Sequence, residues 1–356
     1  MTVAFVTNSP APYRIKQMGL LSDFIGENID FYYTEPLGDD RKWSVDDALH
    51  RYLRQSFYLK GYGWLCLGVN SIVKDSRFLI LGGYESPTYL WLAILCLIQR
   101  KPYFVLHDGI APSRLNRASF GIKSWPKKFV VKNACGCWVN GSLSKRLFES
   151  LGVNAKNIAN QYLVSDLDEG SNESSIAEVV FSFCQGRKVA FYSGRLISRK
   201  NVSSLLKAVQ KMGDSWRLII AGHGDSEDEL KRDSNDQVLF LGHVEQSDLS
   251  FLYKVVDVTV LVSDDEPWGL VIYEAMKNNC PVIVGPDVGC ASDLVVDKVN
   301  GVVLSGIEVE TIQKGLKTSI GLDKDELTKC NSGILSEWNL NSSLKEFGNL
   351  LEASNA

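Results

Sequence analysis

Short β-rich runs alternate with helical stretches along the whole chain, and this alternation limits the fold more than any other feature. It predicts parallel sheets covered by helices, an α/β architecture. In the first half we expect strands at residues 3–7, 30–34, 78–81, 103–106 and 136–140. The rhythm restarts in the second half, with strands expected at 189–193, 218–221, 238–241, 258–262, 281–284 and 301–304. Helices are predicted between them at 13–24, 87–98, 142–151, 202–212, 249–255 and 270–278.

A chain of 356 residues is long enough for about two domains. Residues 166–175 are acidic, rich in serine and short of apolar side chains, which is typical of a linker. We therefore predict a first domain over 1–165, a second over 187–335, and a closing segment, 336–356, whose helix packs back on the first domain. Parallel α/β units bind ligands at the carboxyl ends of their strands, so two facing units would share a cleft.

Composition and charge narrow the functional class. No G-x-G-x-x-G turn follows the first strand of either half, which disfavours a dinucleotide-dependent oxidoreductase. The net charge of −4 divides into +5 for residues 1–170 and −9 for the remainder. The amino terminus has no secretory signal pattern, and the longest apolar run, 89–98, is about half a bilayer span. The eight scattered cysteines fit a reducing compartment, so we expect a soluble cytoplasmic protein.

The most informative segment is S-D-D-E-P-W-G-L-V-I-Y-E-A-M, residues 263–276. A strand leads into a tight acidic turn, and Pro267 suits the first turn of a helix because it lacks an amide hydrogen. Helix N-termini attract anions, so the amides of Trp268, Gly269 and Leu270 would form an anion site. Glu266 and Glu274 flank it, and carboxylates beside an anion site suit the hydroxyls of a sugar or ribose. Alternatively, one carboxylate stabilises the helix and the other is an ordinary surface glutamate.

A second segment, S-G-R-L-I-S-R-K-N at 193–201, combines a strand end, a glycine and cations on a loop before a helix. Arg195 offers a planar fork of donors and Lys200 a point charge, a pair that suits a diphosphate. The simpler interpretation is that Arg199 and Lys200 lie on a solvated loop.

Together these segments resemble the retaining glycosyltransferases of family 4. Glu266 to Glu274 matches that family's E-x7-E motif, and 275–283 resembles its A-M-A-x-G-x-P-V-I run, with Asn279 in place of glycine. Residues 194–201 are similar to its G-R-x-x-x-x-K-[GN] motif. The resemblance covers the second domain and implies a GT-B fold, two Rossmann-like domains facing a central cleft, with the donor held in the second and the acceptor in the first.

The resemblance also implies residue roles. Glu266 would contact the donor sugar, Glu274 the ribose hydroxyls, and Arg195 with Lys200 the pyrophosphate. The turn containing Gly222 and Gly224 would lie beside the phosphates. The backbone of His243 and Val244 would contact the base. A glycine after a strand is also common turn chemistry, so these turns alone are weak signals.

In the first domain, His107 ends a strand and aligns with a histidine that in many family members touches the donor sugar near the reacting carbon. It could equally be a core histidine with satisfied hydrogen bonds. The loops at 8–14 and 82–86 resemble family loops that contact sugar or acceptor.

Metal dependence is not expected. Asp166-Leu167-Asp168 fits the D-x-D pattern of metal-dependent glycosyltransferases of another fold, but it lies in the predicted linker, away from the donor motifs. We interpret it as accidental and predict no essential metal or other cofactor.

The expected function is therefore a retaining, metal-independent transfer of a hexose-type sugar from a nucleotide diphosphate sugar, most simply a UDP-sugar, to a saccharide acceptor. Many relatives extend polyprenyl-diphosphate-linked surface polysaccharides such as O-antigen or capsule. Two alternatives remain: a nucleotide-sugar epimerase of the same fold, and a catalytically inactive nucleotide-sugar-binding scaffold.

A basic stretch in the first half predicts a partner. Residues 100–146 carry ten Lys or Arg and one acid, Asp108, with Phe120, Trp125 and Phe129 among them. Cations and amphipathic rings suit the surface of an anionic membrane, which would place the enzyme on the inner face of the plasma membrane. A solvated basic face is the alternative, and nucleic acid is disfavoured because the whole protein is acidic.

Overall fold

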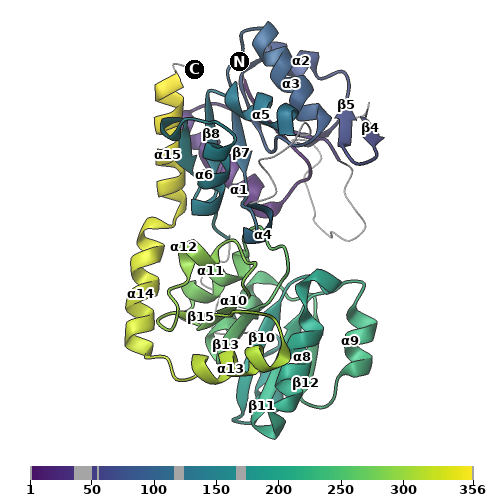
Figure 1. Cartoon of the computed structure of the whole chain (residues 1–356), viewed down its shortest axis with the longest axis vertical. Coiled ribbons are helices and arrows are strands. Elements are labelled where there is room, and N and C mark those ends of the chain that lie inside the picture. The colour runs from purple at the N-terminus through teal and green to yellow at the C-terminus, as the bar shows by residue number, and fades with distance from the viewer. Residues whose placement is uncertain (1, 36–49, 54–55, 116–123, 166–173, 355–356) are drawn as a thin grey trace. The chain divides into compact units, whose positions relative to one another are not determined.

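The computed structural model describes residues 2–35, 50–53, 56–115, 124–165 and 174–354. The chain forms two compact units (Figure 1). Unit 1 contains Met1–Gly109, Leu115–Leu163 and Asn339–Ala356, and unit 2 contains Ile110–Arg114 and Val164–Trp338.

Unit 1 is built on a seven-stranded sheet in the order β3-β2-β1-β6-β7-β8-β9, and all its neighbouring strands are parallel. The central strands β1, β6 and β7 are almost wholly buried, as expected for a parallel sheet covered on both faces. The strands are β1 (Thr2–Thr7), β2 (Ile29–Tyr33), β3 (His50–Tyr52), β6 (Ser76–Leu81), β7 (Tyr103–His107), β8 (Gly136–Val139) and β9 (Ile158–Asn160).

Helices of unit 1 come from both ends of the chain: α1 (Pro12–Ile25), α2 (Asn70–Asp75), α3 (Pro87–Ile98), α4 (Pro112–Leu115, whose first three residues are counted with unit 2), α5 (Trp125–Lys132), α6 (Gly141–Ser150) and α15 (Leu340–Ser354). A short 3-10 turn is formed by Ala155–Asn157. Helix α15 is a core element, because Leu344, Phe347 and Leu350 are buried among the side chains of the sheet. A separate antiparallel hairpin, β4 (Ser56–Leu59) and β5 (Gly63–Cys66), packs beside α3.

Unit 2 repeats the plan with a six-stranded parallel sheet in the order β12-β11-β10-β13-β14-β15. Its core joins the inner strands to α8 and α13. The strands are β10 (Lys188–Ser193), β11 (Trp216–Ala221), β12 (Val238–Gly242), β13 (Val258–Leu261), β14 (Val282–Val284) and β15 (Gly301–Val303).

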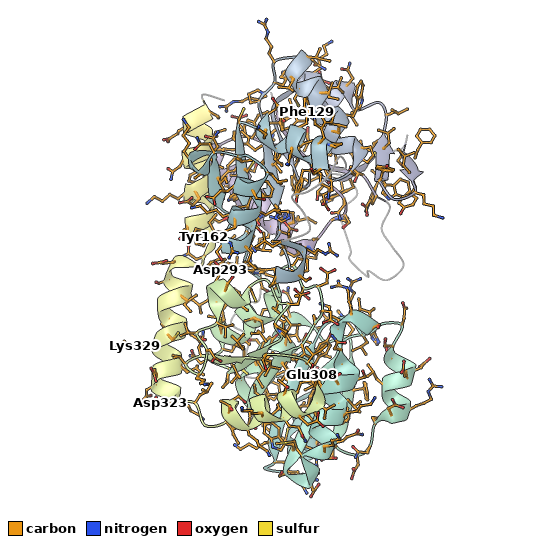
Figure 2. The ribbon with its side chains drawn as sticks, viewed as in Figure 1. Phe129, Tyr162, Asp293, Glu308, Asp323 and Lys329 are labelled. Carbon is orange, nitrogen blue, oxygen red and sulfur yellow. The ribbon has the colours of Figure 1, made fainter. Side chains whose placement is uncertain are left out.

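The helices of unit 2 are α7 (Ala177–Cys184), α8 (Val202–Lys211), α9 (Glu227–Asp233), α10 (Gln246–Val255), α11 (Leu270–Lys277), α12 (Ala291–Leu294), α13 (Val309–Ser319) and α14 (Lys324–Glu337). Short 3-10 turns occur at Ser198–Lys200 and Gly213–Ser215. Asp323 caps α14, accepting the amide hydrogens of Asp325 and Glu326 at 2.9 Å each (Figure 2). No helix among the described residues is both long and apolar enough to cross a membrane.

The α/β class with parallel sheets is confirmed, and each predicted strand is present within about two residues of its expected ends. One detail was wrong: α11 begins at Leu270, so Pro267 precedes the helix instead of lying in its first turn. The predicted ranges did not include the edge strands β3 and β9, the hairpin β4–β5, or the helices α2, α4, α5, α7, α9, α12, α13 and α14.

Candidate functional site

Four loops meet at the carboxyl edge of the unit 2 sheet. They follow β10, β11, β12 and β13, which are neighbours in the order β12-β11-β10-β13. Because the strands are parallel, residues 194–201, 222–226, 243–245 and 262–269 all emerge at the same edge. All the second-half residues predicted to bind the donor lie on these loops or on α11.

The glycines of the β11 loop permit main-chain packing that other residues would block. A Cβ on Gly222 would lie 1.9 Å from the Gly194 carbonyl oxygen, and one on Gly224 would lie 2.3 Å from that of Leu196. The Leu196 amide donates to the His223 carbonyl at 2.8 Å, and the Gly222 amide donates to the Gly242 carbonyl at 2.6 Å. The first three loops are therefore joined through their backbones, and the glycines have a structural role whatever they bind.

Lys200 and Glu266, which the motifs place in separate roles, form an ion pair. Lys200 lies in the 3-10 turn after β10, Glu266 in the loop after β13, and each side chain is only 12% exposed. Three further hydrogen bonds join the same loops. Arg199 donates from Nη1 to the Asp265 carbonyl at 2.8 Å, Asn201 donates from Nδ2 to the Val262 carbonyl at 3.1 Å, and the Asp264 amide donates to the Arg199 carbonyl at 2.8 Å. The cation and the carboxylate therefore neutralise each other.

Arg195 projects from the first residues of the β10 loop and is exposed. Its carbonyl accepts a hydrogen bond from the Tyr192 hydroxyl at 2.9 Å, which fixes the backbone from which the guanidinium extends. Arg195, which is exposed, and Lys200, which is half-buried, are thus two cations on one short loop.

Glu274 lies on α11 and is half-buried. The Tyr253 hydroxyl donates to its Oε2 at 2.8 Å, and the Ser165 hydroxyl donates to its Oε1. Burial raises the pKa of the Glu274 carboxyl above its ordinary value, and these two hydrogen bonds oppose the shift. An ordinary surface glutamate would have neither the burial nor the two fixed donors.

The segment entering α11 is tightly constrained. Gly269 has φ 101°, and a Cβ there would lie 2.6 Å from the Leu261 side chain. The Trp268 side chain is buried and stacks on Trp338 at 5.1 Å, so Trp268 can offer a ligand only its backbone. Within the described part of the chain, the amides of Trp268, Gly269 and Leu270 donate to no protein carbonyl, as expected for a free helix N-terminus.

A histidine that the sequence analysis did not single out organises the predicted base-binding loop. The His243 amide donates to His223 Nε2 at 3.0 Å, so this nitrogen accepts. His223 Nδ1 then carries the proton and faces Glu227 Oε2 at 2.8 Å. The His243 side chain is 70% exposed and its backbone amide is already engaged, whereas Val244 is half-buried beside it. The one sequence signal for this contact is that a histidine follows each of two successive strands, His223 after β11 and His243 after β12.

In unit 1, His107 ends β7, and its ring packs against those of Tyr84 and Phe148 at centroid distances of 5.5 and 5.3 Å; these two rings also contact each other at 5.2 Å. Its Nδ1 lies 3.2 Å from the Ser144 hydroxyl. Burial lowers the pKa of His107, while the Asp108 and Glu85 carboxylates oppose that change, so the ring is neutral near pH 7.

The loops of unit 1 noted in the sequence are brought together here. Asp108 pairs with Arg14 and accepts a hydrogen bond from the Tyr13 hydroxyl at 3.2 Å. Tyr84, from the 82–86 loop, contacts His107. The loops after β1, β6 and β7 therefore form one polar and aromatic cluster at the carboxyl edge of this sheet.

Some predicted features lie outside the described residues: Asp166, Leu167 and Asp168, and, in the basic stretch, Arg117, Phe120 and Lys123. In the described ranges, no group of three or more His, Cys, Asp or Glu side chains could hold a metal ion.

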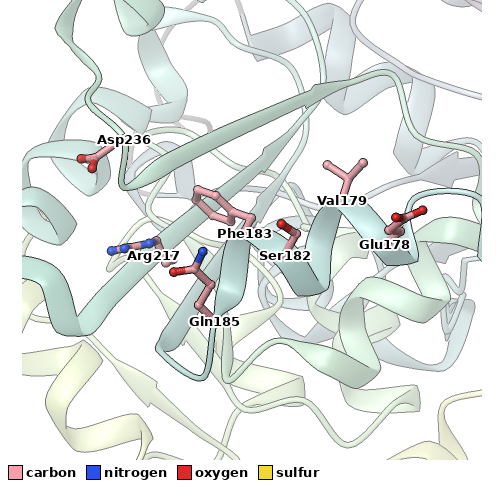
Figure 3. A pocket seen from close by; sticks show the side chains of 7 residues that line it. All are labelled: Glu178, Val179, Ser182, Phe183, Gln185, Arg217 and Asp236. Carbon is pink, nitrogen blue, oxygen red and sulfur yellow. The ribbon is translucent and has the colours of Figure 1, made fainter.

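A separate open hollow of about 610 Å³ lies at the opposite edge of the unit 2 sheet (Figure 3). Arg217 near the start of β11, Asp236 before β12 and residues of α7 line it. Its position at the amino ends of the strands separates it from the four loops. The buried Arg217 guanidinium is already bonded to Asp214 at 2.9 Å, so the hollow offers no unpaired cation to an anionic ligand.

Comparisons with known proteins match the part of the chain that contains the four loops at the carboxyl edge of the unit 2 sheet. Residues 179–329 match the family model described as glycosyl transferases group 1, a range that contains all four loops. An uncharacterized glycosyltransferase of Methanocaldococcus jannaschii is 36% identical over 122 residues, which cover 32% of this chain and 31% of that protein. The O-antigen chain mannosyltransferase RfbU of Salmonella typhimurium is 36% identical over 91 residues, 24% of this chain and 26% of the relative. The matches thus span about a third or less of these relatives' lengths.

Solved structures match over the whole chain at lower identity. HepE of Anabaena, solved in complex with UDP, has a TM-score of 0.75 at 17% identity, covering 99% of this chain and all of that one. The lipopolysaccharide outer core galactosyltransferase WaaB has a TM-score of 0.70 at 15% identity, covering 99% of both chains. At such identities the likeness establishes the fold. The chain therefore has the GT-B fold of two Rossmann-like domains, and its second unit matches the group 1 glycosyl transferases in sequence.

Proposed function

We propose that this protein is a retaining glycosyltransferase that transfers a hexose-type sugar from a UDP-sugar to a saccharide acceptor. The observation that carries the proposal is the Lys200–Glu266 pair beside the open amides at the start of α11. A cation, a carboxylate and a helix N-terminus at one sheet edge are what a diphosphate bonded to a sugar requires. The family match over the same residues supports it.

In the proposed donor complex, Arg195, Lys200 and the amides of Gly269 and Leu270 hold the diphosphate. Glu266, released from Lys200, accepts hydrogen bonds from the sugar hydroxyls. Glu274 already faces two hydroxyl donors, Ser165 and Tyr253, so its carboxylate suits exchange of one of them for a ribose hydroxyl. The base contacts the backbone near His243 and Val244, and His107 of unit 1 is proposed to contact the sugar.

The proposed reaction breaks the bond from the anomeric carbon to the phosphate oxygen and forms a bond to the acceptor oxygen on the same face of the sugar. The acceptor proton passes to the departing phosphate oxygen. Charge that develops on the diphosphate is stabilised by Arg195, Lys200 and the helix amides, the electrostatic contribution that is commonly the largest in catalysis. Because these groups already balance the diphosphate, we propose that no metal is required.

We further propose that the acceptor is a growing surface polysaccharide on a polyprenyl diphosphate carrier, reached at the cytoplasmic face of the membrane. Relatives with O-antigen mannosyltransferase names support this class of acceptor. In this scheme unit 1 binds the acceptor, and its Arg14–Asp108 cluster supplies polar contacts to sugar hydroxyls.

The experiment is a panel of nucleotide sugars, assayed for nucleoside diphosphate release with and without lipid-linked acceptors, in chelator and in manganese. We expect release from one UDP-sugar, dependent on acceptor and insensitive to chelator, with the anomeric configuration retained in the product.

Two other outcomes would replace the proposal. Conversion of the donor to an isomer without acceptor would identify an epimerase, and tight UDP binding without any turnover across the panel would identify a binding scaffold. Loss of activity in chelator with recovery in manganese would contradict metal independence.

A further inference from the structure

Helix α3 has no charged residue, although part of its surface faces solvent. Its exposed positions recur with the helical period: Trp91 is 38% exposed, Leu97 43% and Ile98 71%. Leu90 and Ile94, on the same face, are partly exposed. An outer helix face of a protein in water normally carries charged and polar residues, so this face is built for an apolar neighbour.

The β4–β5 hairpin beside α3 has the same character. Phe57, Tyr58 and Leu59 are consecutive and all exposed, by 57, 62 and 40%, so both faces of β4 lack cover. At the tip, Tyr62 is 62% exposed, and Gly61 at φ 80° helps to form the tight turn. Residues 56–69 contain no acid and one cation, Lys60.

These elements adjoin one another because α3 contacts α2, α5 and β5. They cluster at one end of unit 1 in Figure 1. Helix α5 adds Trp125, which is 63% exposed and whose ring contacts that of Phe129 at 5.6 Å. Phe129 is labelled in Figure 2. We call the exposed apolar side chains of α3, the hairpin and Trp125 the α3 face.

The charge around the α3 face is positive. Residues 56–101 and 124–132 carry eight Lys or Arg against two acids, Asp75 and Glu85. Lys127 is paired with Glu85 and Arg77 with Glu27, which leaves six of the eight Lys or Arg against Asp75. Lys60, Lys74 and Lys132 are exposed, so the rim of the apolar surface attracts anions.

We propose that the α3 face inserts into the headgroup region of an anionic lipid bilayer and attaches unit 1 to it. Exposed tryptophan and tyrosine with flanking lysine is the composition that favours the membrane interface. The twelve residues of α3 are too few to cross a bilayer, but enough to lie along its surface. The proposal deepens the proposed function, on which it rests for the lipid-linked acceptor. It places the main contact on the α3 face, which keeps only Trp125 of the residues 100–146.

A bilayer fits this surface better than a second copy of the chain. A symmetric dimer would bring the cationic rims of two copies together, which opposes association, whereas anionic headgroups complement them. The projecting hairpin also suits a deformable lipid layer.

The test is cosedimentation with phosphatidylcholine vesicles, either alone or with about 30 mol% phosphatidylglycerol. The full-length protein is compared with Trp91→Gln/Ile98→Gln on α3 and with Tyr58→Ser/Tyr62→Ser on the hairpin. We expect binding to the anionic vesicles and a loss of at least about tenfold in each double variant, because exposed apolar side chains supply the insertion energy. Such exposed substitutions leave the fold intact, which is checked by circular dichroism.

The matched control is Val179→Gln/Ile320→Gln, which removes two apolar side chains of unit 2, 53 and 45% exposed, and should bind vesicles like wild type. The double variant Lys128→Glu/Lys132→Glu tests the contribution of charge to vesicle binding separately from the insertion of apolar side chains. It should weaken binding to anionic vesicles, and about 0.5 M salt should reduce wild-type binding without abolishing it.

Three outcomes would overturn the proposal. Wild type could remain in the supernatant with anionic vesicles at low salt. The apolar variants could bind like wild type while the lysine variant does not. Sedimentation could instead show a dimer that the α3 variant dissociates, which would make the face an interface between copies. UDP affinity, measured in parallel, tests the proposed function separately, because its absence would leave the vesicle result standing.

Discussion

The loops at the carboxyl edges of the two sheets are held together in different ways. In unit 2 the loops after β10, β11 and β12 are joined through main-chain atoms, with Gly222 and Gly224 allowing contacts that a Cβ would block. In unit 1 they are joined through side chains, such as the Arg14–Asp108 pair and the rings around His107. Main-chain packing tolerates few alternatives to glycine, whereas rings and ion pairs can be exchanged for other residues. The loop packing of unit 2 is therefore the less tolerant of substitution, although the motifs recognised there consist mainly of charged residues such as Lys200 and Glu266.

The largest expected effect tests this difference directly. Gly222→Ala places a Cβ 1.9 Å from a carbonyl oxygen at φ 132°, so we expect a loss of more than about 3 kcal/mol in unfolding free energy, or failure to fold. Gly82→Ala in unit 1 meets the Thr7 side chain at 2.6 Å, and should cost about 1–3 kcal/mol. Denaturant titration of both variants measures the two costs.

Gly333→Ala is the control, since a Cβ there meets nothing within 4 Å on α14. It should be neutral or stabilise by up to about 1 kcal/mol. If Gly222→Ala and Gly82→Ala lost the same unfolding free energy, the distinction between loops joined through main-chain atoms and loops joined through side chains would be removed.

Lys200→Ala should weaken UDP binding by about 1.5–3 kcal/mol, because it removes a charge-assisted contact to the diphosphate. Calorimetric titration with UDP measures this loss, and Lys207→Ala, on the exposed side of α8, is the matched control. Wild-type affinity in a folded Lys200→Ala variant would exclude this lysine from the diphosphate site.

Glu266→Gln should have opposite effects on binding and on turnover. Without the carboxylate, Lys200 is no longer neutralised, so UDP should bind about threefold to tenfold more tightly. Transfer should nevertheless fall by about two decades, because the sugar contact is lost. If both quantities fell together, the ion pair would be supporting the loop and not competing with the donor.

Glu274→Gln has the smallest expected effect, on the pH dependence of stability. Burial raises the folded-state pKa of Glu274, so the wild-type contribution is greatest below the unfolded-state pKa. It is lost as pH rises through the folded-state value. Relative to wild type, the variant should therefore gain stability as pH rises from about 4 to about 7. Parallel denaturant titrations measure the difference, and a constant difference across this range would contradict the raised pKa.

Sequence reasoning predicted the strands of both sheets well, because buried parallel strands are continuous apolar runs. It missed β3 and β9 because three-residue edge strands have no periodicity of their own. It missed the hairpin because its apolar residues lie on exposed β4 instead of alternating between a core and solvent.

For the candidate site, the sequence identified Lys200 and Glu266 singly, but their pairing depends on two loops separated by 66 residues. The same holds for Glu274 and Ser165, which lie 109 residues apart. Contacts of this kind are set by the order of strands in the sheet, which local patterns do not encode.

Helix α15 makes the first unit depend on residues that the ribosome adds after the whole of the second. Phe347 is fully buried against Trp138 and Phe104, at 4.7 and 5.2 Å. Ser343 donates to the Gln161 carbonyl inside the same unit. This side of the unit 1 sheet therefore stays uncovered until unit 2 and then α15 have been synthesised. A nascent chain arrested before residue 340 would expose that surface to chaperones and proteases, even though every strand of both sheets had been made.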